Sequence, residues 1–581
     1  MAVRRGVIVV LVLIFMAVAV SVLGLVFVGL TMGRGPQVGA NSTLVLEVGG
    51  DLLENEPAGV FGQLFEAPPT VRSVVDSLRK AAVDRRVTSV VLRPTGNAAL
   101  WGKVQEIRDA VIAFKQSKKP IVAFLESGGD QQYYLASAAD KVYLMPSASL
   151  DLTGMASYEM FLRGALDKLG ATPDAIHVGD YKTASNTFTE HSFTPAHREM
   201  AEALNTDLFN QLVSGIAEGR HKSVDEVRKL IDHGPYLPED AVRAGLVDDL
   251  AYEDELDDKV QLGRGPIRAL RQADYRHVTP QSLGLNRGPR IALIYAVGMI
   301  NTGQSSENSM TGQVLGSDTM VEYLRKARAD DSIRAIVLRI DSPGGSAIAS
   351  DVIWREIMLT REKKPVIASM SDVAASGGYY IAMPAHTIVA QPATLTGSIG
   401  VVLIRFVLDG TLDKLGVNIE TVKQGQYADI FSPVRPFTPD ERKKIGDLMQ
   451  ATYDTFVEKA AAGRNTTPER IDAIAQGRVW TGKQARDLGL VDELGGLERA
   501  LEIAKERAKI AAGAEVELVV YPPKRSIFEA VAEPLRTQGS AAALGQLLGD
   551  RNARAVEALA APLRLFRRGE PLALMPQVWI K

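Results

Sequence analysis

Short apolar runs alternate along the chain with longer segments in which apolar residues recur every three or four positions. In one stretch, the apolar runs 334–340, 365–371 and 387–390 are separated by the helix-like segments 350–364 and 376–385. Short apolar runs are typical of buried strands, and the wider spacing is typical of amphipathic helices. The alternation predicts an α/β unit with a largely parallel sheet and helical crossovers, in which the loops after the strands are available for chemistry.

The same pattern occurs twice in the chain. VVLR at residues 90–93 matches IVLR at 336–339, and LDKLG occurs at 166–170 and again at 412–416. Both pairs are offset by 246 residues, because 336 − 90 = 246 and 412 − 166 = 246. Solenoid repeats are far shorter, about 20–45 residues, so this period predicts two large units of one fold in tandem.

An uncharged apolar segment precedes both units. Residues 7–32 are long enough to cross about 30 Å of hydrocarbon. Arg4 and Arg5 stand before this segment, whereas after Arg34 the next basic residue is Arg72, so the positive-inside rule places the N-terminus in the cytoplasm. A cleaved signal peptide has a shorter apolar region of about 7–15 residues. We therefore predict one uncleaved transmembrane helix with the rest of the chain outside.

These patterns divide the chain into four parts. We expect a cytoplasmic start and transmembrane anchor in residues 1–34, an N-terminal unit in 35–275, a C-terminal unit in 276–515 and a tail in 516–581. The tail is rich in Ala, Leu and Arg, and this composition favours a helix.

Composition excludes several functions. The 581 residues include no cysteine, which rules out disulfides, thiolate zinc sites and a cysteine nucleophile. With 66 basic and 69 acidic residues the formal charge is −3, so no nucleic acid partner is expected. No metal-ligand spacing such as H-E-x-x-H occurs, and we predict neither a catalytic metal nor a cofactor.

Two glycine-rich turns in the second unit follow predicted strands. In DSPGGS, Gly344 and Gly345 allow backbone N–H groups to approach a ligand closely, as an oxyanion hole requires. In AASGGYY, Ser376 stands where a helix is predicted to begin, in a position suited to a nucleophile. The alternative is that Ser376 only caps this helix, a frequent role for serine.

The repeat favours the catalytic interpretation. Subtracting 246 maps Ser376 onto Asp130 and the pair Gly344-Gly345 onto Ala98-Ala99, so the first unit lacks the hydroxyl and both glycines. Loss of all three together indicates that they share one task.

The opposite loss occurs at a second shared motif. GDYK in the first unit aligns with GQYA in the second, so Lys182 corresponds to Ala428. A buried lysine with a lowered pKa is able to take the proton of a serine hydroxyl. We therefore predict one composite site between the units, with Ser376 from one and Lys182 from the other. A solvated loop lysine is the alternative.

Other serine enzyme classes fit less well. Ala374 stands where a G-x-S-x-G elbow needs glycine, and no lysine follows Ser376 after three residues. A Ser-His-Asp triad that uses the distant His177 or His191 stays open, because triads have no fixed order in sequence.

The motifs together resemble a known family. DSPGG, AASGGYYIA, LTGSIGV, GRVWTG and LGLVDELGG in the second unit, with GDYKTA in the first, are similar to those of the long form of the signal peptide peptidase A family, or protease IV. These are membrane-anchored serine-lysine peptidases of bacteria. The resemblance covers nearly the whole chain.

The resemblance implies a site and a biological setting. Ser376 is implied as the nucleophile, Lys182 as the general base, and the N–H groups around Gly344, Gly345 and Gly377 as the oxyanion hole. The implied fold is two tandem Clp-protease/crotonase-like units. The implied setting is a homotetramer in the bacterial inner membrane, with its catalytic part on the periplasmic side, that cleaves signal-peptide remnants and other extended apolar peptides.

Two other functions fit part of the sequence. A crotonase-like acyl-CoA enzyme would explain DSPGG, but it gives Ser376 and Lys182 no task, and an extracytoplasmic location denies it acyl-CoA. A non-catalytic membrane-bound scaffold would keep the fold without needing either residue.

Overall fold

The computed structural model describes residue 16 and residues 38–56, 68–97, 99–261, 268–308, 312–523, 571–575 and 579–580. The expected membrane anchor at residues 7–32 lies outside this part of the chain except for Met16. Among the described residues, no helix has both the length and the apolar character that a membrane span needs.

The first unit is built on a six-stranded parallel sheet in the order β10-β1-β2-β3-β5-β9. Its strands are β1 (Ser42–Gly50), β2 (Val87–Asn97), β3 (Ile121–Leu125), β5 (Lys141–Leu144), β9 (Asp249–Leu250) and β10 (Arg268–Arg271). The connecting helices include α3 (Val71–Val83), α4 (Trp101–Lys115), α5 (Asp130–Ala136), α9 (Val224–Asp232), α10 (Pro238–Arg243), α11 (Leu256–Gln261) and α12 (Gln272–Tyr275). Apolar side chains of this sheet and of α3, α4, α5, α9, α10 and α12 form one buried core, whereas Leu256 and Val260 of α11 pack in a second cluster with other residues of the sheet.

The second unit repeats this topology. Its strands β23, β11, β15, β17, β18 and β22 pair in the same succession, and an additional branch joins β17 to β19 and β21. The strands are β11 (Arg290–Val297), β15 (Ile333–Ser342), β17 (Val366–Ala375), β18 (Thr387–Ala390), β19 (Leu395–Gly397), β21 (Val479–Thr481), β22 (Glu493–Leu494) and β23 (Glu517–Tyr521). Its helices include α13 (Ser317–Ala329), α14 (Ala347–Arg361), α15 (Gly377–Ala382), α18 (Pro468–Ile474), α19 (Gly482–Asp487) and α20 (Leu497–Arg507).

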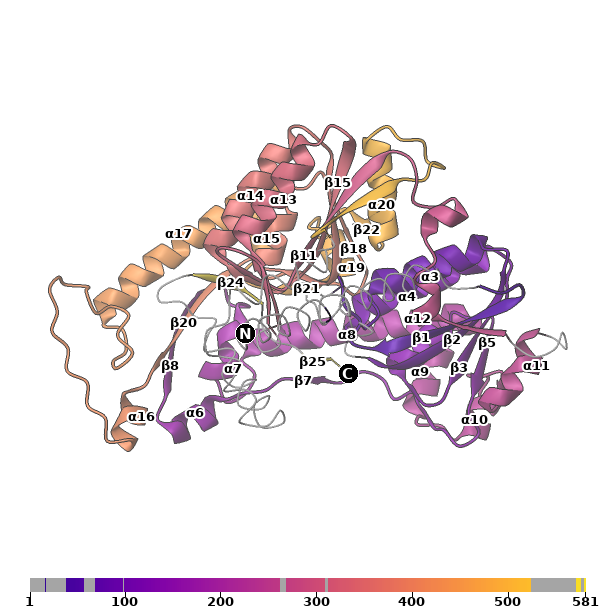
Figure 1. Cartoon of the computed structure of the whole chain (residues 1–581). Coiled ribbons are helices and arrows are strands. Elements are labelled where there is room, and N and C mark those ends of the chain that lie inside the picture. The colour runs from indigo at the N-terminus through magenta and orange to yellow at the C-terminus, as the bar shows by residue number, and fades with distance from the viewer. Residues whose placement is uncertain are drawn as a thin grey trace, which may run out of the picture.

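A third sheet joins the two units. Its order is β13-β14-β12-β16-β24-β20-β8, and β8 of the first unit pairs antiparallel with β20 of the second. The strands are β8 (Thr172–Val178), β12 (Met299–Asn301), β13 (Ser306–Asn308), β14 (Gly312–Gly316), β16 (Gly344–Ser346), β20 (Val401–Val407) and β24 (Leu572–Leu574). The short helices α6 (Arg163–Leu169) and α16 (Asp409–Lys414) lie at the outer end of β8 and β20 (Figure 1).

Each unit also has a long helix that contacts the other unit. The helix α8 (Pro195–Arg220) of the first unit contacts β21, and α17 (Pro439–Gly463) of the second contacts β8 (Figure 1). Both helices begin at a Thr-Pro pair, and the hydroxyl of Thr194 or Thr438 accepts a hydrogen bond from the backbone N–H three residues later. Proline is favoured in the first helical turn because its missing N–H needs no partner there.

A buried ionic cluster fixes the sheet of the second unit to the first unit. Arg339 on β15 is 1% exposed, and its guanidinium donates to Glu54 at 2.9 and 3.0 Å and to Glu106 at 2.7 Å. Ser371 donates to Glu54 and accepts from Arg339 at 3.1 Å. Burial alone would lower the pKa of Arg339, but the two carboxylates raise it well above its ordinary value.

A second ionic contact lies beside the glycine turn. Lys103 on α4 forms an ion pair of 2.8 Å with Asp341, the residue that opens DSPGG. Asp372 on β17 accepts the backbone N–H groups of Leu100 and Lys103, both at 2.8 Å. The start of α4 therefore holds the ends of two neighbouring strands of the other unit.

The described parts of the tail join three sheets, and the stretch on which the helical expectation rests is not among them. These parts are strands: β23 extends the second sheet past residue 515, β24 enters the third sheet, and β25 (Trp579–Ile580) pairs with β7 (Ser157–Tyr158). The stretch 524–570, which contains most of the Ala-rich and Leu-rich sequence, lies outside the described residues. β23 is the edge strand next to β11 in the second sheet, the position that β10 has next to β1 in the first sheet.

We expect Arg339→Met to destabilise the chain by about 3–5 kcal/mol, because it leaves the carboxylates of Glu54 and Glu106 buried without a counter-charge. Urea unfolding of the detergent-solubilised protein measures this loss. The matched control is Lys443→Met, which removes an exposed ion pair with Asp447 and should cost less than about 1 kcal/mol. Equal unfolding free energies for the two variants would contradict the role assigned to the cluster.

Candidate active site

Ser376 lies at a sharp turn between β17 and α15. Its φ of 56° and ψ of −113° are uncommon for a residue with a side chain. The turn is fixed on both sides, because the Ser376 N–H donates to Gly397 O at 2.8 Å and its carbonyl accepts from Tyr380 N at 2.8 Å. The hydroxyl makes no capping hydrogen bond to α15, so the capping alternative does not explain this residue.

Lys182 lies in the loop after β8, just before the short 3-10 helix Thr183–Ser185. The second unit surrounds this loop: Tyr181 N donates to Gln476 O at 2.8 Å. Gly477 has a φ of 78°, and a Cβ there would stand 2.5 Å from Lys182 Cα. Only glycine allows the second unit to approach the lysine backbone this closely.

The two side chains meet inside the protein. Lys182 Nζ lies 2.8 Å from Ser376 Oγ, and Lys182 and Ser376 are 1% and 0% exposed. Burial lowers the pKa of Lys182 well below its ordinary value of 10.5. The lowered pKa favours the neutral amine, the form that is able to accept the hydroxyl proton of Ser376.

Ser398 completes the contacts of the amine. Lys182 Nζ donates to Ser398 O at 2.9 Å and lies 3.0 Å from Ser398 Oγ. Ser398 was not among the residues predicted from the sequence. A signal was present, because Ser398 directly follows an LTG motif that both units share, where the first unit has the apolar Met155.

The three glycines predicted for the oxyanion hole come together beside Ser376. Gly344 and Gly345 have φ values of 100° and 150°, which disfavour any side chain. A Cβ on Gly344 would lie 2.7 Å from Gly377 N, and a Cβ on Gly377 would lie 3.2 Å from Gly345 N. Backbone contact this close requires glycine at Gly344 and Gly377.

The residues that correspond to Ser376 and Lys182 in the opposite units have other surroundings. Asp130, the counterpart of Ser376, is 5% exposed and accepts backbone N–H groups from Thr153 at 3.2 Å and Gly154 at 2.9 Å. Ala428, the counterpart of Lys182, is exposed. The described part of the chain therefore combines one serine and one lysine into one site.

The histidines of the triad alternative lie at the surface. His177 Nδ1 contacts Gly179 O at 3.1 Å, and His191 faces Asp167 at 3.7 Å. Both side chains are exposed, whereas Ser376 is buried and already paired with Lys182. The structure does not bring a histidine from this pair to Ser376.

Comparison with known proteins identifies the family. The model of Peptidase family S49 matches residues 113–265 and 358–511, one segment in each unit. The matched segments cover more than half of the chain and start 245 residues apart (358 − 113 = 245), close to the repeat read from the sequence. The chain belongs to peptidase family S49.

Curated S49 relatives match along most of the chain. The chloroplastic serine protease SPPA of Arabidopsis thaliana is 39% identical over 462 residues, which cover 78% of this chain and 68% of that protein. Protease 4 of Salmonella typhi is 33% identical over 517 residues, which cover 84% and 82%. The family match and these relatives show a serine-type peptidase of the signal peptide peptidase A and protease 4 group.

A likeness to ClpP1 from Listeria monocytogenes is weaker. It is 16% identical, covers 36% of this chain and 94% of that chain, and has a TM-score of 0.22. A score this low does not establish a shared fold. The family match shows two tandem S49 units, whereas the likeness of these units to Clp proteases or crotonases stays a prediction.

We expect the stability of the wild-type chain to rise with pH more steeply than that of Lys182→Met. Between the lowered pKa of the folded state and 10.5, the unfolded chain binds a proton that the folded chain does not, and this adds up to about 1.4 kcal/mol per pH unit. Methionine does not titrate. Urea unfolding at several pH values between 7 and 10 tests this, and parallel curves for both proteins would show that Lys182 is not buried as a neutral amine.

Proposed function

We propose that this protein is a membrane-anchored endopeptidase that cleaves signal-peptide remnants and other extended apolar peptides with a Ser376-Lys182 dyad. The observation that carries the proposal is the 2.8 Å contact between the buried Lys182 amine and the buried Ser376 hydroxyl. The family match supports a peptide substrate, and the uncharged segment 7–32 supports the anchor.

The first half of the reaction is acylation. As Ser376 Oγ attacks the carbonyl carbon of the substrate, Lys182 Nζ takes its proton, and the carbonyl oxygen becomes an oxyanion. Backbone N–H groups of the Gly344, Gly345 and Gly377 cluster stabilise this charge. Lys182 then gives the proton to the leaving amine, the C–N bond breaks and an ester of Ser376 remains.

The second half returns the enzyme to its starting state. Lys182 takes a proton from water, the hydroxide oxygen attacks the ester carbon, and the proton returns to Ser376 Oγ as the acid product leaves. Ser398 positions the amine throughout, because its carbonyl and hydroxyl oxygens lie 2.9 and 3.0 Å from Nζ. No cofactor enters either half.

The location and assembly belong to the same proposal. The polarity of the N-terminal segment supports a single-pass protein of the bacterial inner membrane with its catalytic part in the periplasm, in contact with the lipid bilayer only through this segment. The family resemblance supports a homotetramer of Clp-protease/crotonase-like units.

We expect Ser376→Ala to lower kcat/KM for a fluorogenic apolar peptide by about 10³-fold or more, because no nucleophile remains. Lys182→Met should lower it by about 10²–10⁴-fold through the loss of the base. The matched controls are Ser149→Ala and Lys443→Met, which change exposed residues and should keep wild-type activity. A wild-type protein without peptidase activity, or a Lys182→Met variant with full activity, would contradict the dyad.

A further inference from the structure

Arg478 lies in the part of the second unit that packs against the loop of Lys182. It stands between α18 and β21, and its Cζ lies 4.6 Å from the ring centre of Tyr181 and 4.5 Å from that of Trp480. Tyr181 directly precedes Lys182 in the first unit, whereas Trp480 belongs to β21 of the second. The guanidinium therefore contacts one aromatic ring from each unit.

Glu199 on α8 fixes this arrangement from the side of the first unit. Its carboxylate accepts a hydrogen bond from Arg478 Nη1 at 2.6 Å and another from the Tyr181 hydroxyl at 2.8 Å. Arg478 and Tyr181 are half-buried, and Glu199 is exposed. One carboxylate thus orients both the guanidinium and the ring on which it stacks.

The backbone around Arg478 binds residues on both sides of the catalytic amine. Ser398 N donates to Arg478 O at 2.7 Å, and Tyr181 N donates to Gln476 O at 2.8 Å. Ser398 supplies the oxygens that contact Lys182 Nζ, and Tyr181 is the residue before the lysine. Residues 476–478 therefore hold the base and its hydrogen-bond acceptor together.

Trp480 extends these contacts to the support of the serine. A Cβ on Gly397 would stand 2.9 Å from Trp480 Cδ1, so the indole packs directly on the backbone of Gly397. The carbonyl of Gly397 accepts the Ser376 N–H at 2.8 Å. The indole itself is fixed, because its Nε1 donates to Ile474 O at 2.9 Å. The stack of Tyr181, Arg478 and Trp480 thus adjoins the surroundings of both reacting groups.

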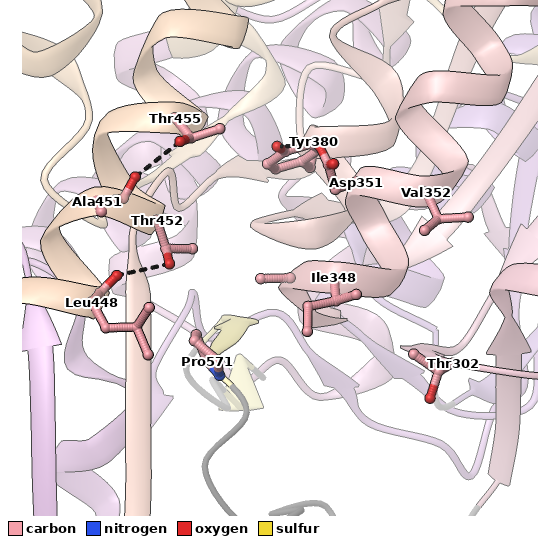
Figure 2. Close-up of a pocket in the computed structure, with 11 residues that line it drawn as sticks. Thr302, Ile348, Asp351, Val352, Tyr380, Leu448, Ala451, Thr452, Thr455 and Pro571 are labelled. Carbon is pink, nitrogen blue, oxygen red and sulfur yellow. Dashed lines mark hydrogen bonds between the residues drawn. The ribbon is translucent and has the colours of Figure 1, made fainter. Parts of the chain in front are cut away.

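A cation over an aromatic ring is not unusual in this protein. Lys459 on α17 lies 3.8 Å from the ring centre of Trp354 on α14, and it pairs with Asp351. Asp351 lines a cavity of about 680 Å³ between α14 and α17 (Figure 2). Both helices belong to the second unit, so this contact stabilises packing within one unit. Arg478 differs, because its two rings come from different units and adjoin the dyad.

The first unit has no counterpart of this arginine. LVDDL at residues 246–250 matches LVDEL at 490–494, an offset of 244 residues because 490 − 246 = 244. Subtracting 244 maps Arg478 onto Gly234, which has no side chain beyond a hydrogen. The arginine is therefore present only in the unit that packs against Lys182.

We propose that Arg478 is a positioning residue that holds the loop of Lys182 against Ser398 and keeps water away from the amine. This inference rests on the proposed function, since it gives Lys182 the task of the base. Arginine suits this role because its planar guanidinium stacks on rings while its N–H groups bind a carboxylate. The oxygens that contact Lys182 Nζ are uncharged, and burial is the cause of its lowered pKa. Loss of the stack would therefore act on the amine through the entry of water.

Arg478→Met tests this role by kinetics. We expect kcat for an apolar reporter peptide to fall about 10–100-fold with little change in KM, because the base is displaced while substrate contacts remain. The acid limb of the pH profile of kcat should move to higher pH by at least about one unit, because water raises the pKa of Lys182 towards 10.5. Arg478→Lys should lie between the two proteins, since it keeps the charge without the planar stack.

The matched control is Arg228→Met. Arg228 on α9 is also half-buried, and its Cζ lies 5.3 Å from the ring centre of Phe209, so this variant should keep wild-type kinetics. Tyr181→Phe should keep the stack and most of the activity, whereas Tyr181→Leu should behave like Arg478→Met. An Arg478→Met variant with the wild-type kcat would overturn the proposal, and so would a lower kcat with an unshifted pH profile.

Unfolding measurements separate this inference from the proposed function, because they report the pKa of Lys182 without catalysis. The difference in unfolding free energy between a chain with Lys182 and the same chain with Lys182→Met rises with pH only between the pKa of the folded state and 10.5. In the Arg478→Met background, this rise should begin at least about one pH unit higher than in the wild-type background. A shifted onset with no peptide hydrolysis by the wild-type chain would remove the peptidase proposal alone. An unshifted onset with an active wild-type chain would remove the role of Arg478 alone.

Discussion

The burial of one amine without a counter-charge is the constraint on which the site depends. Lys182 comes from the first unit, but its surroundings come largely from the second: Ser376, Ser398 and the close approach of Gly477. A lysine on one unit alone would be solvated and protonated. The contact between the units lowers the pKa of Lys182, because it removes water from the amine, and this is the property that the proposed base needs.

The same contact must hold the amine within hydrogen-bond reach of the hydroxyl. The ionic cluster at Arg339 holds the sheet of the second unit against the first. The start of α4 also forms an ion pair with Asp341 and hydrogen bonds with Asp372, at the ends of the strands that lead into the glycine turn and Ser376. On the opposite side, β8 leads into Lys182 and is paired with β20. Packing between the units therefore sets the position of both reacting groups.

The two copies made the main site residues predictable from sequence. Ser376 alone resembles a helix cap and Lys182 alone resembles a surface lysine, but each is missing from the opposite copy. Ser398 was not predicted: the difference from Met155 after the shared LTG motif was a signal, but the contact of Ser398 with Lys182 is visible only in the folded chain. Arg339 lies inside an apolar strand run, where its partners Glu54 and Glu106 are distant in sequence. The strand β24 at residues 572–574 was also not predicted. It is held by backbone hydrogen bonds to β16, and a strand of three residues is too short to show an alternation of apolar and polar side chains.

The pH dependence of the reaction between Ser376 and a fluorophosphonate tests the central claim most directly, since it reports the state of the base without a substrate peptide. We predict that the second-order rate constant of the wild-type chain falls on the acid side with an apparent pKa well below 10.5. In Lys182→Met, the rate should be lower by at least about 10²-fold and should lose this pH dependence. An apparent pKa near 10.5, or a Lys182→Met variant that reacts as fast as the wild type, would contradict the account.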